Sequence, residues 1–138
     1  MTVTKILLAL ARFLDAEGVG VFKISTPYVA TDTAITLKRL PASPDQAISV
    51  TLYDHEDAAY GLADAWARVQ LRFRAPGPVT AVDDLADAAH AVLNDRHNFD
   101  MGGVRVSRAR RLNVAPMGQD ANRREERADN YELILRLP

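Results

Sequence analysis

The side chains that could carry chemistry are few, and the three histidines come first because they could bind a metal ion or move a proton. His55 lies beside Glu56 and Asp57, a composition that suits acid–base catalysis but equally fits a solvated turn after a strand. His90 and His97 are seven positions apart on an expected helix. Two helical turns are too long a gap for two ligands of one metal ion. We therefore expect no metal site.

The motifs of nucleophilic and phosphate-binding enzymes are missing as well. The sequence contains no cysteine, which removes thiolate nucleophiles, thiolate zinc sites and disulfides. It contains no GxxxxGK[ST] or GxGxxG pattern and no serine in a nucleophile elbow. Asp83, Asp84 and Asp87 fall at the start of an expected helix, where carboxylates favour the helix dipole. These features predict a protein that is not an enzyme and that carries no cofactor.

A basic stretch in an expected strand is the most suggestive local feature. On that strand, Arg108 and Arg110 would share a side with apolar residues, and burying unpaired arginines is costly. Either a bulge near Ala109 changes the facing, or this end of the strand leaves the core. Binding of nucleic acid would favour interleaved aromatic residues, and none lies between Phe99 and Tyr131. We favour a surface or interface role over direct contact with nucleic acid.

A second charged segment, residues 115–129, is expected to be a long loop that joins two strands of a hairpin. Loops of this length inside a compact domain are usually functional or disordered. This one is either a mobile hairpin tip or an arm that becomes ordered against a partner. We hypothesise that the arm and the basic strand form a subunit interface through Arg105, Arg108, Arg110, Arg111, Asp120, Arg123, Arg124, Glu125, Glu126 and Arg127.

Apolar periodicity predicts the elements that position these residues. Helices are expected at 3–16, 80–96 and, in a short form, 58–65, and strands at 19–24, 34–40, 47–53, 66–74, 102–114 and 131–137. Thr2 or Thr4 would cap the first helix, and Thr80 with Asp83 would form a capping box for a later one. Because the strands cluster as hairpins, the sequence predicts an α+β fold: a mainly antiparallel sheet with helices packed on one face, and a long hairpin arm. The expected core includes Leu10, Phe13, Val50, Leu52, Val69, Leu71, Leu93, Leu133 and Leu135.

Length and composition describe an ordinary globular chain. The 138 residues fit a single domain, 1–138, with 48% apolar and 25% charged residues. A net charge of −1 provides no global basic field for nucleic acid. The apolar run at 6–11 is too short to span a bilayer, and no signal-peptide pattern surrounds it. We expect a soluble, non-secreted protein without a membrane partner.

Four segments, in their order and spacing, resemble the tail terminator or minor capsid proteins of long-tailed bacteriophages, especially the actinobacterial type. The resemblance covers nearly the whole chain, and its most telling part is the final segment. The segments are GVGVF at 18–22; AITLKRLP at 34–41, followed by Pro44, Asp45 and AISVTLY at 47–53; VQLRFR at 69–74; and PMGQDANRRE at 116–125, followed by Asn130 and Tyr131.

The resemblance implies a structural virion protein, a small α+β protomer that assembles into a homohexameric ring at the head-proximal end of the tail tube. Such a ring ends tube polymerisation and joins the tail to the head–tail connector protein, so its partners are its own copies, the tail tube protein and the connector. DNA passes through its centre without sequence-specific binding. The protein would reside in the tail or neck of the virion, after assembly in the host cytoplasm. The family contributes no catalytic residues.

Other functions remain open at this point. A different neck ring protein, such as a head–tail stopper or tail completion protein, is also small and ring-forming. A nucleic-acid-binding module would use the basic stretch, and its binding would weaken steeply with salt. A small-ligand or enzymatic domain would need a pocket with converging polar groups, which the sequence does not indicate.

Overall fold

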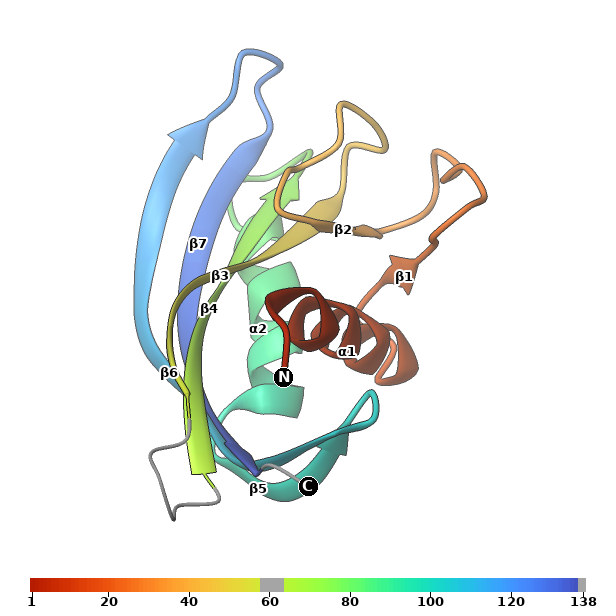
Figure 1. Ribbon diagram of the computed structural model, residues 1–138. Coiled ribbons are helices and arrows are strands. Elements are labelled where there is room, and N and C mark those ends of the chain that lie inside the picture. Colours follow the sequence, from red (N-terminus) through yellow and green to blue (C-terminus); the bar gives the residue numbers. More distant parts are fainter. Residues whose placement is uncertain (58–63, 137–138) are drawn as a thin grey trace.

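The computed structural model describes residues 1–57 and 64–136. Seven strands within these residues form one sheet in the order β1-β2-β3-β4-β7-β6-β5. The sheet curls like half of a barrel, and both helices lie inside the curl (Figure 1). The elements are α1 (Val3–Ala16), β1 (Val21–Phe22), β2 (Ala34–Leu37), β3 (Ala47–Glu56), β4 (Asp64–Ala75), α2 (Ala81–Leu93), β5 (Arg96–Met101), β6 (Val104–Gln119) and β7 (Glu125–Arg136).

The predicted fold class, α+β with a mainly antiparallel sheet, is wrong. The structure is mostly β, with a curled mixed sheet and two short helices of 14 and 13 residues. Strands β1, β2 and β3 run parallel to one another, and only from β3 onward is the pairing antiparallel. The segments 23–33 and 38–46 return the chain to the same end of the sheet instead of reversing it. Apolar alternation identifies a strand but not its direction, so the hairpin assumption failed here.

Helix α1 matches its prediction. The Oγ1 atom of Thr2 accepts a hydrogen bond from the N–H of Lys5 at 3.2 Å, which caps the first turn. At the other end, Gly18 adopts φ +79° and donates its N–H to the carbonyl of Asp15 at 2.9 Å. The apolar face of the helix is buried in the curl of the sheet, and Leu10 has no exposed surface.

Helix α2 differs from its prediction at both ends. Thr80 makes no side-chain capping bond, and the Asp83 carboxylate accepts a hydrogen bond from an arginine of β7, so the expected capping box does not form. The helix ends at Leu93, and the residues expected to continue it form the start of β5. His97 therefore lies on a strand while His90 lies on the helix, so the two do not share a helical face.

The predicted long loop at 115–129 is wrong, although the two strands that it was expected to join do pair as a long antiparallel hairpin. Strand β6 continues to Gln119 and β7 begins at Glu125, so only a tight turn separates them. Charged residues occupy these strands because cross-strand ion pairs and exposure to solvent satisfy them. One register shift of β6 lies between Val106 and Arg108, and Ala109 after it is buried. This confirms the bulge alternative for the basic stretch.

The core fills the space between the helices and the concave side of the sheet. Of the nine predicted core residues, eight are buried and Leu52 is partly buried. The short helix expected at 58–65 falls on residues 58–63, which lie outside the described residues, and Asp64 and Ala65 belong to β4. No helix in the described part of the chain combines the length and hydropathy that crossing a membrane requires.

Candidate functional site

The turn between β6 and β7 is organised by Asp120. Its carboxylate accepts the N–H groups of Asn122 and Arg124, both at 2.9 Å, and its own N–H donates to the carbonyl of Arg124 at 2.9 Å. Aspartate suits such turns because its short side chain can bind the backbone that follows it. The hydrogen bond from the Arg124 N–H is the main reason that the pKa of Asp120 lies below its usual value. Asp120 therefore holds the turn together as an ionised carboxylate.

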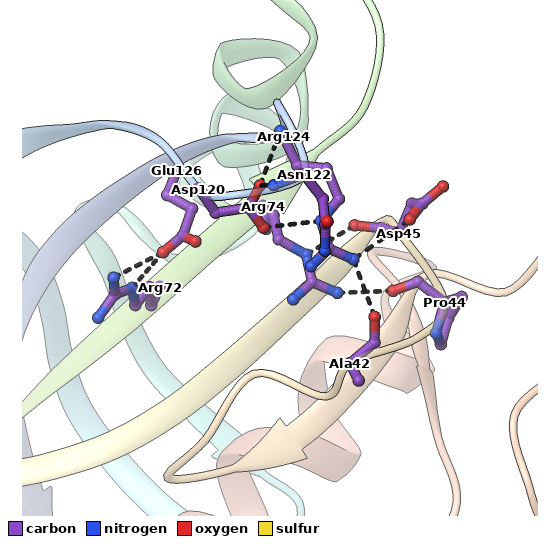
Figure 2. Close-up of polar contacts among 9 residues, drawn as sticks. All are labelled: Ala42, Pro44, Asp45, Arg72, Arg74, Asp120, Asn122, Arg124 and Glu126. Carbon is purple, nitrogen blue, oxygen red and sulfur yellow. Dashed lines mark hydrogen bonds and ion pairs between the residues drawn. The ribbon is translucent and has the colours of Figure 1, made fainter.

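Arg124 fastens this turn to the connection between β2 and β3. Its Nε donates to the Asp120 carboxylate at 2.7 Å, and its Nη1 donates to the carbonyl of Ala42 at 2.9 Å and to Asp45 at 3.2 Å. Figure 2 shows the guanidinium between the two segments. The side chain is only 10% exposed. Two segments about 80 residues apart in the chain are thus joined by one planar donor, whose fork geometry suits several acceptors at once.

Arg74, near the end of β4, binds the same connection. Its Nε donates to the carbonyl of Asp45 at 2.9 Å and its Nη2 to the carbonyl of Pro44 at 2.7 Å (Figure 2). The residue is 3% exposed, and no described carboxylate pairs with it directly. Burial, reinforced by the nearby charge of Arg124, lowers the pKa of Arg74 below its usual value. The cluster therefore contains a buried positive charge that neutral carbonyls solvate.

An open groove borders this cluster, which we call the basic groove. Its wall includes the exposed residues Lys38 and Arg39 and the side chains of Arg72, Arg74 and Arg124. Glu126 is the acidic residue of the wall, and its carboxylate pairs with Arg72 at 2.6 Å. Cations outnumber carboxylates here although the whole chain has a net charge of −1. The groove is therefore locally electropositive.

A second polar network lies on the inner side of β7. Arg127 donates to both carboxylate oxygens of Asp129, at 2.8 and 3.1 Å, and to Asp83 at the start of α2 at 2.8 Å. Arg111 lies 3.5 Å from the same Asp129 carboxylate. Burial raises the pKa of the neighbouring Tyr131, whose hydroxyl finds no hydrogen-bond partner among the residues described here. This network joins the sheet to α2.

The predicted interface residues therefore separate into three groups. Arg105, Arg108, Arg110 and Arg123 are exposed; among them, Arg108 pairs with Asp95 at 3.0 Å and Arg110 with Glu132 at 3.4 Å. Asp120, Arg124 and Glu126 belong to the cluster beside the basic groove, and Glu125 is half-buried at the start of β7. Arg111 and Arg127 point into the inner network.

Sequence reasoning missed four cations of the basic groove: Lys38, Arg39, Arg72 and Arg74. A signal was present for two of them, because Arg72 and Arg74 alternate with apolar residues along β4 and so face away from the core. Nothing in the sequence pattern indicated that the turn after β2 would lie beside them.

Every network described here fastens strands, turns and helices to one another. The described residues contain no group of three or more acidic or histidine side chains placed to hold an ion. The sequence matches the family of bacteriophage tail terminator proteins over residues 13–137, and the chain belongs to that family. The family resemblance inferred from the sequence is thereby confirmed, and the protein is a structural component of a phage tail.

A solved structure shows the same fold. A chain in the virion of a native gene transfer agent particle superimposes with a TM-score of 0.59 at 12% sequence identity. The match covers 73% of this chain and 78% of the other chain. At this level of identity the similarity concerns the fold. No curated protein matches the sequence.

Proposed function

We propose that this protein forms a homohexameric ring at the head-proximal end of the phage tail tube, where it ends tube polymerisation and joins the tail to the head–tail connector. Membership of the tail terminator family over nearly the whole chain is the observation that carries this proposal. The fold shared with a chain of a gene transfer agent virion supports it.

A closed ring requires heterologous contacts, in which two different surfaces of one protomer meet. The exposed cations on β6 and on the turn that follows it, Arg105, Arg108, Arg110 and Arg123, are available to such a contact. Arg111, Arg124 and Arg127 contribute by fixing the strands and the turn that present them, because their own charges are satisfied within the protomer.

The proposed partners are further copies of this chain, the tail tube protein and the connector. DNA crosses the ring without sequence-specific binding, as the family resemblance implies, and the net charge of −1 gives the protomer no overall basic field. The protein acts in the tail or neck of the virion and assembles in the host cytoplasm.

Complementation of a phage that lacks the gene tests this function. We expect tails of irregular, excessive length without the protein, and tails of normal length joined to heads when the wild-type chain is supplied. Electron microscopy measures tail length and joining, and native mass determination of the purified chain or of detached necks measures subunit number. Tails of normal length that fail to join heads in its absence would instead assign the protein to a later joining step and contradict termination.

A further inference from the structure

The basic groove displays two cations that no residue in the described part of the chain neutralises. Lys38 and Arg39 are exposed and form no ion pair with any residue in the described ranges. Their backbone is nevertheless fixed: the N–H of Lys38 donates to the carbonyl of Val50 at 2.8 Å, and the hydroxyl of Thr36 donates to the carbonyl of Arg39 at 2.6 Å. The turn therefore presents both charges at a defined place beside β3.

The floor of the groove adds one buried cation to this charge. Arg74 is buried with only carbonyl oxygens as direct partners. Charges in poorly solvated surroundings are screened less than charges at an open surface. A carboxylate that entered the groove would therefore meet the exposed cations at the rim and the field of the buried Arg74 below.

The densest run of exposed carboxylates lies toward the far end of the same strand. Asp54, Glu56 and Asp57 are all exposed. Their partners within the protomer are the half-buried Arg68 and Trp66 and the exposed His55. Lys38 lies beside Val50 in the middle of β3, whereas Glu56 is the last residue of that strand. Six residues of extended strand span roughly 20 Å. Glu56 and Asp57 of one protomer therefore cannot reach the exposed cations of its own groove.

We propose that the basic groove of one subunit receives the acidic segment 54–57 of a second copy of this chain. The contact is head-to-tail, because groove and segment are different surfaces, the segment lying at the end of β3 and the groove beside its first half. Such a contact uses two different surfaces and can close into a ring, and charge complementarity fixes which surfaces meet. This inference rests on the proposed ring and names the chemistry of its subunit contact.

Charge reversal on either side tests the contact. The variant Lys38→Glu/Arg39→Glu and the variant Glu56→Lys/Asp57→Lys should each weaken assembly by more than about tenfold, because like charges then face each other. An equimolar mixture of the two should assemble again, since each reversed groove now fits a reversed segment in alternating order. The matched control Lys5→Glu/Arg12→Glu changes charge equally on the exposed side of α1 and should assemble like the wild type.

Crosslinking provides a test inside assembled particles. The chain contains no cysteine, so the variant Arg39→Cys/Asp57→Cys carries only the two thiols of interest. A short bismaleimide should join these positions in neighbouring subunits and give a ladder of covalent multimers from purified particles, whereas Lys5→Cys/Arg12→Cys should not. Particles that contain the variant, have normal tails and give no ladder would overturn the contact while leaving the terminator function intact. Failure of the wild-type chain to restore tail length would overturn the function itself.

Discussion

Asp129 and Arg127 lie two positions apart on β7 and form a two-bond ion pair, Nε to Oδ1 at 2.8 Å and Nη2 to Oδ2 at 3.1 Å. The Asp129 side chain has no exposed surface, and Arg111 and Asp83 complete the network around the pair. The arginine that sequence reasoning assigned to a mobile arm is therefore part of the joint between the sheet and α2. Its contribution to an assembly is indirect, through the rigidity of β7.

The first prediction concerns this pair. Asp129→Asn removes the carboxylate and leaves Arg127 buried without its main partner, which should lower the free energy of unfolding by about 3–5 kcal/mol. Chemical denaturation monitored by circular dichroism measures the change. The control Asp95→Asn breaks the exposed pair with Arg108 and should cost no more than about 1 kcal/mol. If the two variants lost the same free energy of unfolding, burial would not make the inner ion pair more important for stability than the exposed one.

The second prediction concerns the joint at the basic groove. Arg124→Ala removes the bonds to Asp120, to the carbonyl of Ala42 and to Asp45, so both the turn and the connection between β2 and β3 lose their common partner. Hydrogen exchange should accelerate at 42–46 and 120–125, while the exchange of α1 and the centre of β4 stays unchanged. Arg123→Ala, at the adjacent exposed position, is the control. Unchanged exchange at 42–46 would mean that Arg124 does not hold the two segments together.

The third prediction concerns pH. The pKa of Asp120 is lower in the folded protein than its ordinary value of 3.8, chiefly because the Arg124 N–H binds the carboxylate. The unfolded chain therefore binds the proton more readily, and the stabilisation is present above pH 3.8 and is lost as pH falls through the folded pKa. Asp120→Asn should show a shallower loss of stability over that acidic range. Acid titration of the unfolding midpoint for both proteins measures the difference, and parallel titration curves would contradict it.

The elements with strong periodicity were predictable from the sequence. The apolar spacing and the Thr2 cap identify α1, and the alternation of β3 and β4 identifies two central strands, because both patterns reflect burial of one face. Strand direction was not predictable, since the parallel pairs β1–β2 and β2–β3 depend on how the connections pack. The charged ends of β6 and β7 looked like a loop because their ion pairs join residues distant in sequence. Glu126, for example, pairs with Arg72 of β4.

In the candidate site, too, some residues were predictable from the sequence and others were not. Asp120 and Arg124 stood out in the sequence as a charged turn, and the structure joins them at 2.7 Å. Arg74 could not be recognised, because its partners are the main-chain carbonyls of Pro44 and Asp45, whose positions depend on the folded connection. Local charge therefore predicted part of the site, and the tertiary placement of one turn supplied the rest.

The fourth prediction concerns the core beneath these networks. Leu71, at the centre of β4, has no exposed surface, and truncation to alanine should lower the free energy of unfolding by about 2–5 kcal/mol through lost burial and a cavity. The control Val79→Ala, at a residue that is 65% exposed, should change stability by less than about 0.5 kcal/mol. A midpoint of Leu71→Ala equal to that of the wild type would place the concave face of β4 outside the core.

The last prediction separates assembly from stability at Lys38. This residue adopts φ +70°, a left-handed conformation that costs a residue with a Cβ about 1 kcal/mol or more and that glycine adopts freely. Lys38→Gly should therefore keep or raise the unfolding midpoint, because the N–H bond to Val50 is retained and the strain is relieved. It should nevertheless weaken assembly, because the basic groove loses one of its two exposed cations.

Asn98→Gly is the matched control, with φ +50° at an exposed position outside the groove, and it should affect stability similarly while leaving assembly unchanged. Thermal unfolding and native mass determination on the same preparations measure both properties. Wild-type assembly by Lys38→Gly would show that this cation does not contribute to the contact between subunits.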